Sequence, residues 1–134
     1  MRLTKKSEYA LLALVDLAKC YQKDPAKILE VSERNGIPKK YLEQISLQLK
    51  GSGYVRSLRG ANGGYELSKP PEKITLAEII RLIDGPLASV GSASLYFFEH
   101  TPIERNEKLL QVFKDIRNMV AAKLENTTLD QLIE

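Results

Sequence analysis

The feature that most restricts the fold of this chain is a glycine-dense turn at residues 59–65, with the sequence RGANGGY. Short apolar runs, Tyr54-Val55 and residues 65–67, lie on either side of it. Glycine reaches backbone conformations with positive φ and has no Cβ, so this arrangement predicts a β-hairpin. The same property lets the tip of the hairpin approach another surface closely, and Arg59 places a cation at its edge.

A helix-turn-helix pattern precedes the hairpin. A short helix is predicted over about residues 28–35, with Ile28, Leu29 and Val31 directed toward the core. Gly36 can take the left-handed backbone conformation that ends a helix, so we expect the chain to turn there.

A second helix is predicted over residues 38–50, because Pro38 suits the first turn of a helix. Leu42, Ile45 and Leu49 repeat at helical spacing and predict one buried face. The other face carries charged, amide and aromatic side chains, which are the types that read base edges or bind phosphates. They are Lys39, Lys40, Tyr41, Glu43, Gln44 and Gln48.

Three further helices are predicted. The first is capped by Thr4 or Ser7 and runs to about residue 21, and a later one over residues 75–83 opens with a T-x-x-E capping box. A turn-prone segment then leads to a long helix over about residues 103–125. Its apolar residues are spaced by threes and fours, as in a helix packed along another helix. They are Leu109, Val112, Phe113, Ile116, Met119, Val120 and Leu124.

The charge of the chain is unevenly divided. Up to Lys69 there are 13 Lys and Arg against 7 Asp and Glu, and from Pro70 onward there are 7 against 10. A basic front half is typical of contact with a polyanion. An uneven but solvated surface accounts for the charges equally well.

Several other classes of protein are disfavoured. A single cysteine, Cys20, excludes an internal disulfide and fits a reducing cytoplasm. We expect neither a signal peptide nor a membrane span, because Glu8 and Asp16 interrupt the first apolar region. One histidine, His100, and the lack of a nucleotide-binding or nucleophile motif argue against an enzyme.

The elements occur in the order of a winged helix. At the start of the second helix, Lys39 and Lys40 can meet phosphates, where the helix dipole also favours an anion. One turn later, Gln44 can pair with adenine and Glu43 with cytosine. Arg59 can enter the minor groove, with the glycines of the hairpin allowing close approach. Simpler roles stay open: the lysines as a solvated helix start, the glycines as a tight hairpin, and Tyr41 as a ring packed on the scaffold.

Three motifs together carry a more specific signal: MRLTKKSEYA at residues 1–10, YLEQ at 41–44 and RGANGGY at 59–65. Later landmarks are IIRLIDGP at 79–86 and NTTL at 126–129. In combination they closely resemble the bacterial Rrf2 family of winged-helix transcription regulators, the IscR, NsrR and CymR type.

The resemblance implies a mainly α-helical fold with a small β-hairpin, in three parts. These are a winged helix-turn-helix DNA-binding domain at 1–85, a loop of effector or sensor type at 86–104, and a dimerisation helix with a C-terminal turn at 105–134. It also implies a cytoplasmic homodimer, acting most simply as a repressor, that binds an inverted repeat in double-stranded DNA. The apolar residues of the long helix would form the dimer interface. The DNA contacts carried over by position are Thr4, Lys5 and Lys6 near the backbone, Tyr41, Glu43 and Gln44 in the major groove, and Arg59, Gly60, Asn62, Gly63 and Gly64 in the minor groove.

One departure from the family pattern bears on cofactors. Members that bind an iron–sulfur cluster carry three cysteines before the long helix, and residues 87–108 of this chain contain none. We therefore expect no cluster, no metal and no other cofactor. The signal would then be a small molecule, a partner protein or oxidation of Cys20. The competing hypothesis is a protein-interaction module of the same fold that sequesters a partner.

Overall fold

The computed structural model describes residues 1–61 and 63–134, so the prediction for Asn62 lies outside the described residues. The fold is mainly helical with one antiparallel hairpin, as predicted. Its elements are α1 (Lys5–Lys19), α2 (Ile28–Asn35), α3 (Lys39–Gly51), β1 (Val55–Leu58), β2 (Gly64–Leu67), α4 (Leu76–Ile83) and α5 (Glu107–Glu125). Three 3-10 turns lie between these described elements, η1 (Pro71–Lys73), η2 (Gly91–Ala93) and η3 (Pro102–Arg105), and a fourth, η4 (Leu129–Leu132), follows α5.

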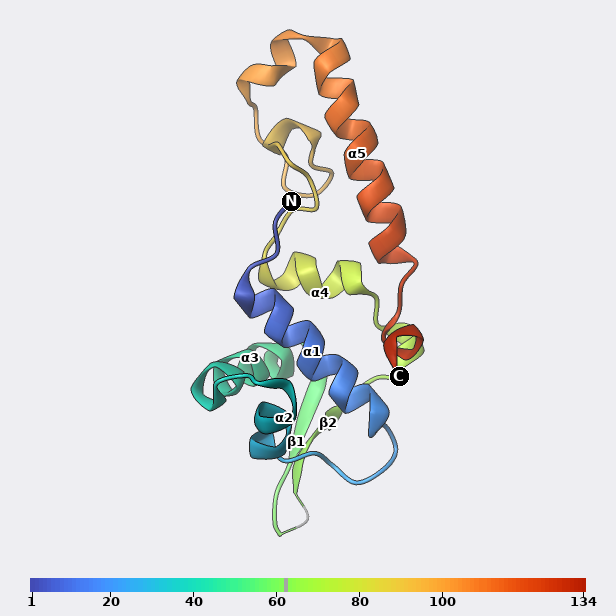
Figure 1. Ribbon diagram of the computed structural model, residues 1–134. Helices are drawn as coiled ribbons and strands as arrows, with labels where there is room; N and C mark the ends of the chain where they lie inside the picture. Colours follow the sequence, from blue (N-terminus) through green and yellow to red (C-terminus); the bar gives the residue numbers. More distant parts are fainter. Residues whose placement is uncertain (62) are drawn as a thin grey trace.

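The molecule has two regions (Figure 1). The three helices α1, α2 and α3 pack around the hairpin, and α4 lies across α1 above them. From this body α5 and the 86–106 segment extend to one side, with α5 running back toward the C-terminus. Within the described residues, no helix is both long and apolar enough to cross a membrane.

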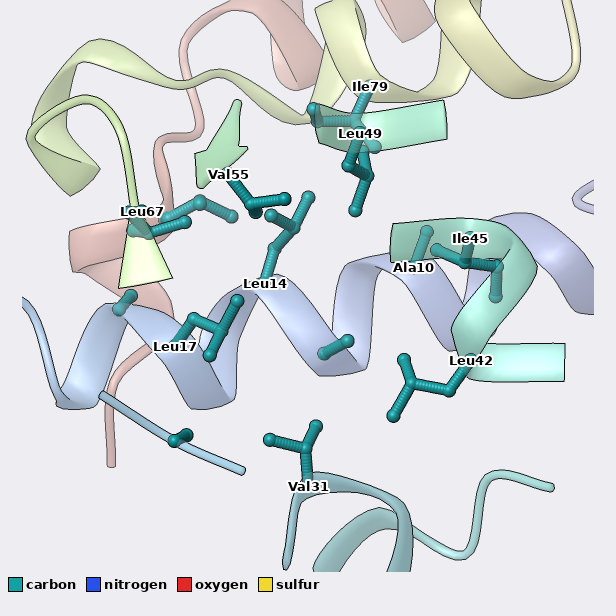
Figure 2. Close-up of a cluster of buried hydrophobic side chains, with 14 of the residues drawn as sticks. Ala10, Leu14, Leu17, Val31, Leu42, Ile45, Leu49, Val55, Leu67 and Ile79 are labelled. Atoms are coloured by element: carbon teal, nitrogen blue, oxygen red, sulfur yellow. The ribbon is translucent and has the colours of Figure 1, made fainter. Parts of the chain in front are cut away.

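The core is built around α1. Alanines alternate with leucines on its buried side, and the small alanines let neighbouring helices come close. Side chains from α2, α3, both strands and α4 converge on this side (Figure 2). The largest of the fully buried side chains are Leu14, Ile45, Leu49, Leu67, Ile74, Ile79, Ile80 and Leu129.

Two details of the helix-turn-helix differ from the prediction. Leu29 is 51% exposed, because it lies two positions before the buried Val31 and so on the opposite side of α2. Pro38 is the N-cap of α3 rather than its first residue, with an extended ψ of 130°. Gly36 ends α2 in the left-handed conformation, with φ of 64°, as expected.

The long helix starts later than the predicted residue 103. Thr101 and Glu104 form a capping box at the start of η3, which makes η3 a turn separate from the long helix. Asn106 then caps α5 by accepting a hydrogen bond from the backbone N–H of Leu109 at 3.0 Å. Two successive caps thus divide one apolar pattern into a short turn and a 19-residue helix.

The C-terminal turn η4 packs against the core around α1. Leu129 is fully buried there, and its backbone N–H donates to the carbonyl of Ile74 at 3.1 Å. The N–H of Leu76 in turn donates to the carbonyl of Thr127 at 3.0 Å. Contacts therefore cross the predicted boundary between the DNA-binding part and residues 105–134.

The start of the hairpin is joined to α4 through Glu78. Its carboxylate accepts hydrogen bonds from the backbone N–H of Thr75 at 2.8 Å and from the Tyr54 hydroxyl at 2.7 Å. The Lys69 ammonium lies 4.6 Å from the centre of the Tyr54 ring. Burial alone raises the pKa of Glu78, but these hydrogen bonds and the charge of Lys69 lower it below its ordinary value.

A carboxyl group with a lowered pKa in the folded state stabilises the fold above its unfolded pKa, and this contribution is lost as the pH falls through the folded value. We therefore expect Glu78→Gln to lower the free energy of unfolding by about 1–2 kcal/mol at neutral pH, through loss of the charged cap. The difference should shrink in acid. Urea unfolding across the acid range measures it, and a constant difference at all pH values would contradict the argument.

Candidate nucleic-acid interface

The outer face of α3 is polar and exposed. Leu42, Ile45 and Leu49 are buried against the core, which turns the opposite side of the helix to solvent. Four residues at helical spacing share that side: Lys40, Glu43, Gln44 and Leu47. Lys39 is exposed at the first turn, beside the N-terminal end of the helix dipole.

Leu47 is the residue on this face that the sequence did not assign to it. Although it is apolar, Leu47 is 68% exposed and continues the row of Lys40, Glu43 and Gln44. A count along the helix from the buried Ile45 and Leu49 would have placed it outward.

The Tyr41 ring packs on the scaffold. It meets the ring of Tyr9 from α1 edge to face, with 5.3 Å between ring centres and 77° between planes. Tyr41 is 36% exposed, so part of it still reaches the surface. Tyr41 therefore packs on the scaffold, and only the part of it that remains exposed can contact a ligand.

The prediction that Gln48 lies on the exposed face is wrong. The residue is half-buried, and its amide nitrogen reaches the carbonyl of Leu82 at 3.5 Å. Its side-chain oxygen is buried without a hydrogen bond. The end of α4 covers this side of α3, which the sequence spacing of α3 alone does not reveal.

The start of α1 lies beside the end of α4. Thr4 caps α1, since its hydroxyl oxygen accepts from the backbone N–H of Ser7 at 3.2 Å. The same hydroxyl donates to the carboxylate of Asp84 at 2.5 Å. The Thr4 hydroxyl therefore both donates and accepts a hydrogen bond within the protein. Lys5, which is exposed, and Lys6, which is half-buried, follow it and supply two cations at this edge.

The hairpin has the form of a wing. Its register pairs Val55 with Leu67 and Leu58 with Gly64, and an ion pair of 2.6 Å joins Arg56 to Glu66 across the strands. Arg59 is exposed where β1 ends. Gly60 follows with φ of 99°, and a Cβ there would meet nothing within 4 Å.

Gly63 and Gly64 have internal reasons to be glycine. A Cβ on Gly63 would collide with the backbone carbonyl of Leu58, and one on Gly64 would lie 2.5 Å from the carbonyl oxygen of Ala26. Next to Gly64, Tyr65 and Ala26 exchange backbone hydrogen bonds of 2.7 and 3.0 Å. The tight-hairpin explanation therefore holds for Gly63, whereas Gly64 is needed because the wing approaches the chain ahead of α2 closely.

We expect Gly64→Ala to lower the free energy of unfolding by about 2–4 kcal/mol, because the added methyl group forces β2 away from Ala26. Gly51→Ala is the matched control: it is helical, lacks positive φ and has open space at its Cβ. That change should be neutral or stabilise by up to about 1 kcal/mol. Thermal and urea unfolding of both variants test the difference, and equal stabilities would refute it.

The predicted interface residues of α5 fall into two groups. Phe113, Val120 and Leu124 are half-buried, and the last two pack with Ala77 and Ile80 of α4 in a second small core. The others form an exposed apolar row along the helix, spaced by three and four residues. They are Leu109, Val112, Ile116 and Met119, with Met119 the most exposed at 73%.

The segment between α4 and α5 is held by its own polar contacts. The hydroxyls of Ser92 and Thr101 lie 2.5 Å apart, and Glu99 donates its N–H to the carbonyl of Gly91 at 3.1 Å. Arg117 of α5 donates to the carbonyl of Ala93 at 2.8 Å. The stretch Leu95-Tyr96-Phe97-Phe98 is exposed on this segment.

Comparison with known proteins then identifies the family. The model of the Rrf2 family, described as an iron-dependent transcriptional regulator, matches residues 3–134. The chain belongs to the Rrf2 family. It is 33% identical to the HTH-type transcriptional regulator CymR of Bacillus subtilis (strain 168) over 132 residues, which cover 98% of this chain and 89% of that protein.

Other relatives agree. The HTH-type transcriptional regulator IscR of Pectobacterium carotovorum subsp. carotovorum (strain PC1) is 34% identical over 135 residues, covering 99% of this chain and 79% of that protein. The solved structure of CymR, the global cysteine regulator of B. subtilis, superimposes with a TM-score of 0.79 at 32% identity, covering 98% and 95% of the two chains. The predictions of a winged-helix transcriptional regulator and of a non-enzymatic role are confirmed.

The Rrf2 family description raises the question of iron, and the donors in this chain do not fit an iron–sulfur cluster. Its one cysteine, Cys20, is the C-cap of α1, outside the 86–106 segment. His100 in that segment is paired with Glu104 at 3.1 Å. Among the described residues, no three His, Cys, Asp or Glu side chains gather as a metal site would require. Without thiolates, a cluster has no ligand set here.

Proposed function

We propose that this Rrf2-family protein is a cytoplasmic, homodimeric repressor that binds an inverted-repeat operator and works without an iron–sulfur cluster. The observation that carries the proposal is the exposed face of α3, on which cationic, amide, carboxylate and apolar side chains stand in one row. An exposed Arg59 at the wing supplements this face.

The side chains of α3 suit the major groove. Lys39 and Lys40 at the N-terminal end bind phosphates and set the register of the helix. Gln44 forms two hydrogen bonds with adenine, and Glu43 accepts one from cytosine. Leu47, one turn later, meets the methyl group of thymine, which is the apolar feature of that groove.

Two further contacts flank the helix. Arg59 enters the adjacent minor groove, where a narrow A·T-rich stretch attracts a guanidinium. Gly60, which has open space around its Cα, lets the backbone of the wing approach. Lys5 and Lys6 bind the phosphate backbone at the start of α1. Tyr41 contacts DNA through the part of its side chain that its packing on Tyr9 leaves exposed.

The exposed apolar row on α5 supports the homodimer. Four large side chains in water along one helix are unfavourable unless a second surface covers them. A second copy related by two-fold symmetry places the same row opposite itself, as helices packed along each other require. The two copies of α3 then read half-sites about one helical turn, ~34 Å, or a multiple of it apart. The 86–104 segment receives the signal, from a small molecule or a partner protein.

The DNA contacts are tested on sequences that the wild-type protein enriches from fragmented host DNA. On the enriched site, Arg59→Ala should cost about 1–3 kcal/mol of binding, and Gln44→Ala a similar amount together with relaxed preference at one base pair. Lys73→Ala, an exposed cation on η1, is the control and should bind as wild type does. Titrations by fluorescence anisotropy measure all three.

An enriched inverted repeat with weakened Arg59→Ala binding supports a sequence-specific regulator. Retention of DNA without a shared motif, unaffected by Arg59→Ala, would contradict it. That result would favour the protein-interaction module, in which the winged helix serves to sequester a partner.

Met119→Asp tests the homodimer. A carboxylate placed within an apolar interface loses its hydration at a cost of several kcal/mol, so the variant should be a monomer and bind the operator more weakly. Leu29→Asp adds the same charge at an exposed leucine of α2 and should keep the wild-type mass. Light scattering over a range of concentrations gives the mass. A monomeric wild type, or a dimeric Met119→Asp variant, would exclude this interface.

A further inference from the structure

One side chain, Asp84, attaches the start of α1 to the end of α4. Its carboxylate accepts hydrogen bonds from the Thr4 backbone N–H at 3.0 Å and from the Thr4 hydroxyl at 2.5 Å. Thr4 is the N-cap of α1, and Asp84 is the C-cap of α4, 80 positions later in the chain. The contact therefore joins two helix ends that meet only in the folded protein (Figure 1).

The location of Asp84 is unfavourable for α4 itself. The C-terminal end of a helix carries a partial negative charge, which repels a carboxylate. The backbone N–H of Asp84 closes the last turn by bonding to Ile80 and Arg81, and this needs no acidic side chain. The carboxylate is thus explained by its contact with Thr4 rather than by the stability of α4.

The surroundings keep this carboxylate charged. Burial alone raises the pKa of Asp84, but the hydrogen bonds from Thr4, the hydroxyl of Ser7 and the charge of Lys6 lower it below its ordinary value. The Ser7 hydroxyl is fully buried near the carboxylate and makes no hydrogen bond of normal geometry. An ionised acceptor strengthens both bonds to Thr4.

We propose that Asp84 is a positioning residue for DNA binding: by holding Thr4, it fixes the first turn of α1 and so places Lys5 and Lys6 against the phosphate backbone. These lysines directly follow Thr4, so the position of the N-cap sets where the backbone of both lysines lies and from where their side chains extend. The 86–104 segment begins two residues after Asp84. A ligand that shifts this segment therefore also acts on the contact between Thr4 and Asp84. The inference rests on the proposed function, because it requires that Lys5 and Lys6 contact DNA.

The salt dependence of binding separates positioning from a merely structural role. Each phosphate contact contributes about 0.9 to the slope of log affinity against log salt concentration. Loss of both lysine contacts in each subunit of a dimer therefore lowers the slope by roughly 4. A variant that is only less stable keeps the wild-type slope when it is measured below its unfolding temperature.

The experiment measures operator affinity over a salt series for Asp84→Ala, for the double variant Lys5→Ala/Lys6→Ala, and for the triple combination. Asp84→Ala should weaken binding at least about tenfold at low salt and lower the slope by roughly 4. The lysine variant should show the same loss, and adding Asp84→Ala to it should change nothing further. Lys73→Ala, the exposed control on η1, should keep the wild-type affinity and slope. Asp84→Asn, which keeps the shape of the side chain and loses the charge, replaces Asp84→Ala if that variant does not fold.

Three outcomes would overturn the inference. Wild-type affinity and slope in folded Asp84→Ala or Asp84→Asn would show that the contact between Thr4 and Asp84 does not place the lysines, while the proposed function stands. Losses that add in the triple variant would show that Asp84 acts elsewhere. An unchanged slope in the lysine variant would show that Lys5 and Lys6 make no contact with phosphates. If the wild-type protein enriches no operator at all, the inference fails together with the proposed function.

Discussion

The structure depends on the burial of one side of α1. Ala10, Ala13, Leu14 and Leu17 lie on that side, and helices α2, α3 and α4, strand β2 and the C-terminal turn all contact it. Burial of a leucine contributes about 2 kcal/mol, and the alanines between them let the neighbouring backbones come close enough to exclude water. The elements of the winged helix are therefore oriented through a common contact rather than through the loops that connect them.

The surface that faces DNA in our proposal is a consequence of this packing. Because α3 buries Leu42, Ile45 and Leu49 against α1, the helix has no freedom to rotate, and Gln44 must point outward. The wing is fixed in a similar manner, by close backbone contact between Gly64 and Ala26 and by the bond from Tyr54 to Glu78. A regulator gains from such rigidity, since side chains held before binding lose less entropy when they meet a base pair.

Much of the fold could be predicted because its signals are local. The capping box of Thr75 and Glu78, the left-handed Gly36 and the spacing of the α3 leucines each act within a few residues, and each appears as expected. One error arose where a distant element decides. Gln48 is covered by the end of α4. Leu29 is a different case, because its exposure follows from its position opposite Val31 on α2. For the candidate site, the types of side chain and the tight turn of the hairpin were evident, whereas the contact of Gly64 with Ala26 was not.

The sequence by itself determined the family, the order of the helices and the chemical character of the face of α3, because periodicity, caps and glycine turns are properties of neighbouring residues. Only the tertiary structure decided that Thr4 is bonded to Asp84, that Leu129 enters the core around α1 and that four apolar residues of α5 stay uncovered. These facts depend on residues tens of positions apart. Such contacts form only when several buried faces pack together at once, and no single segment of the chain encodes the result.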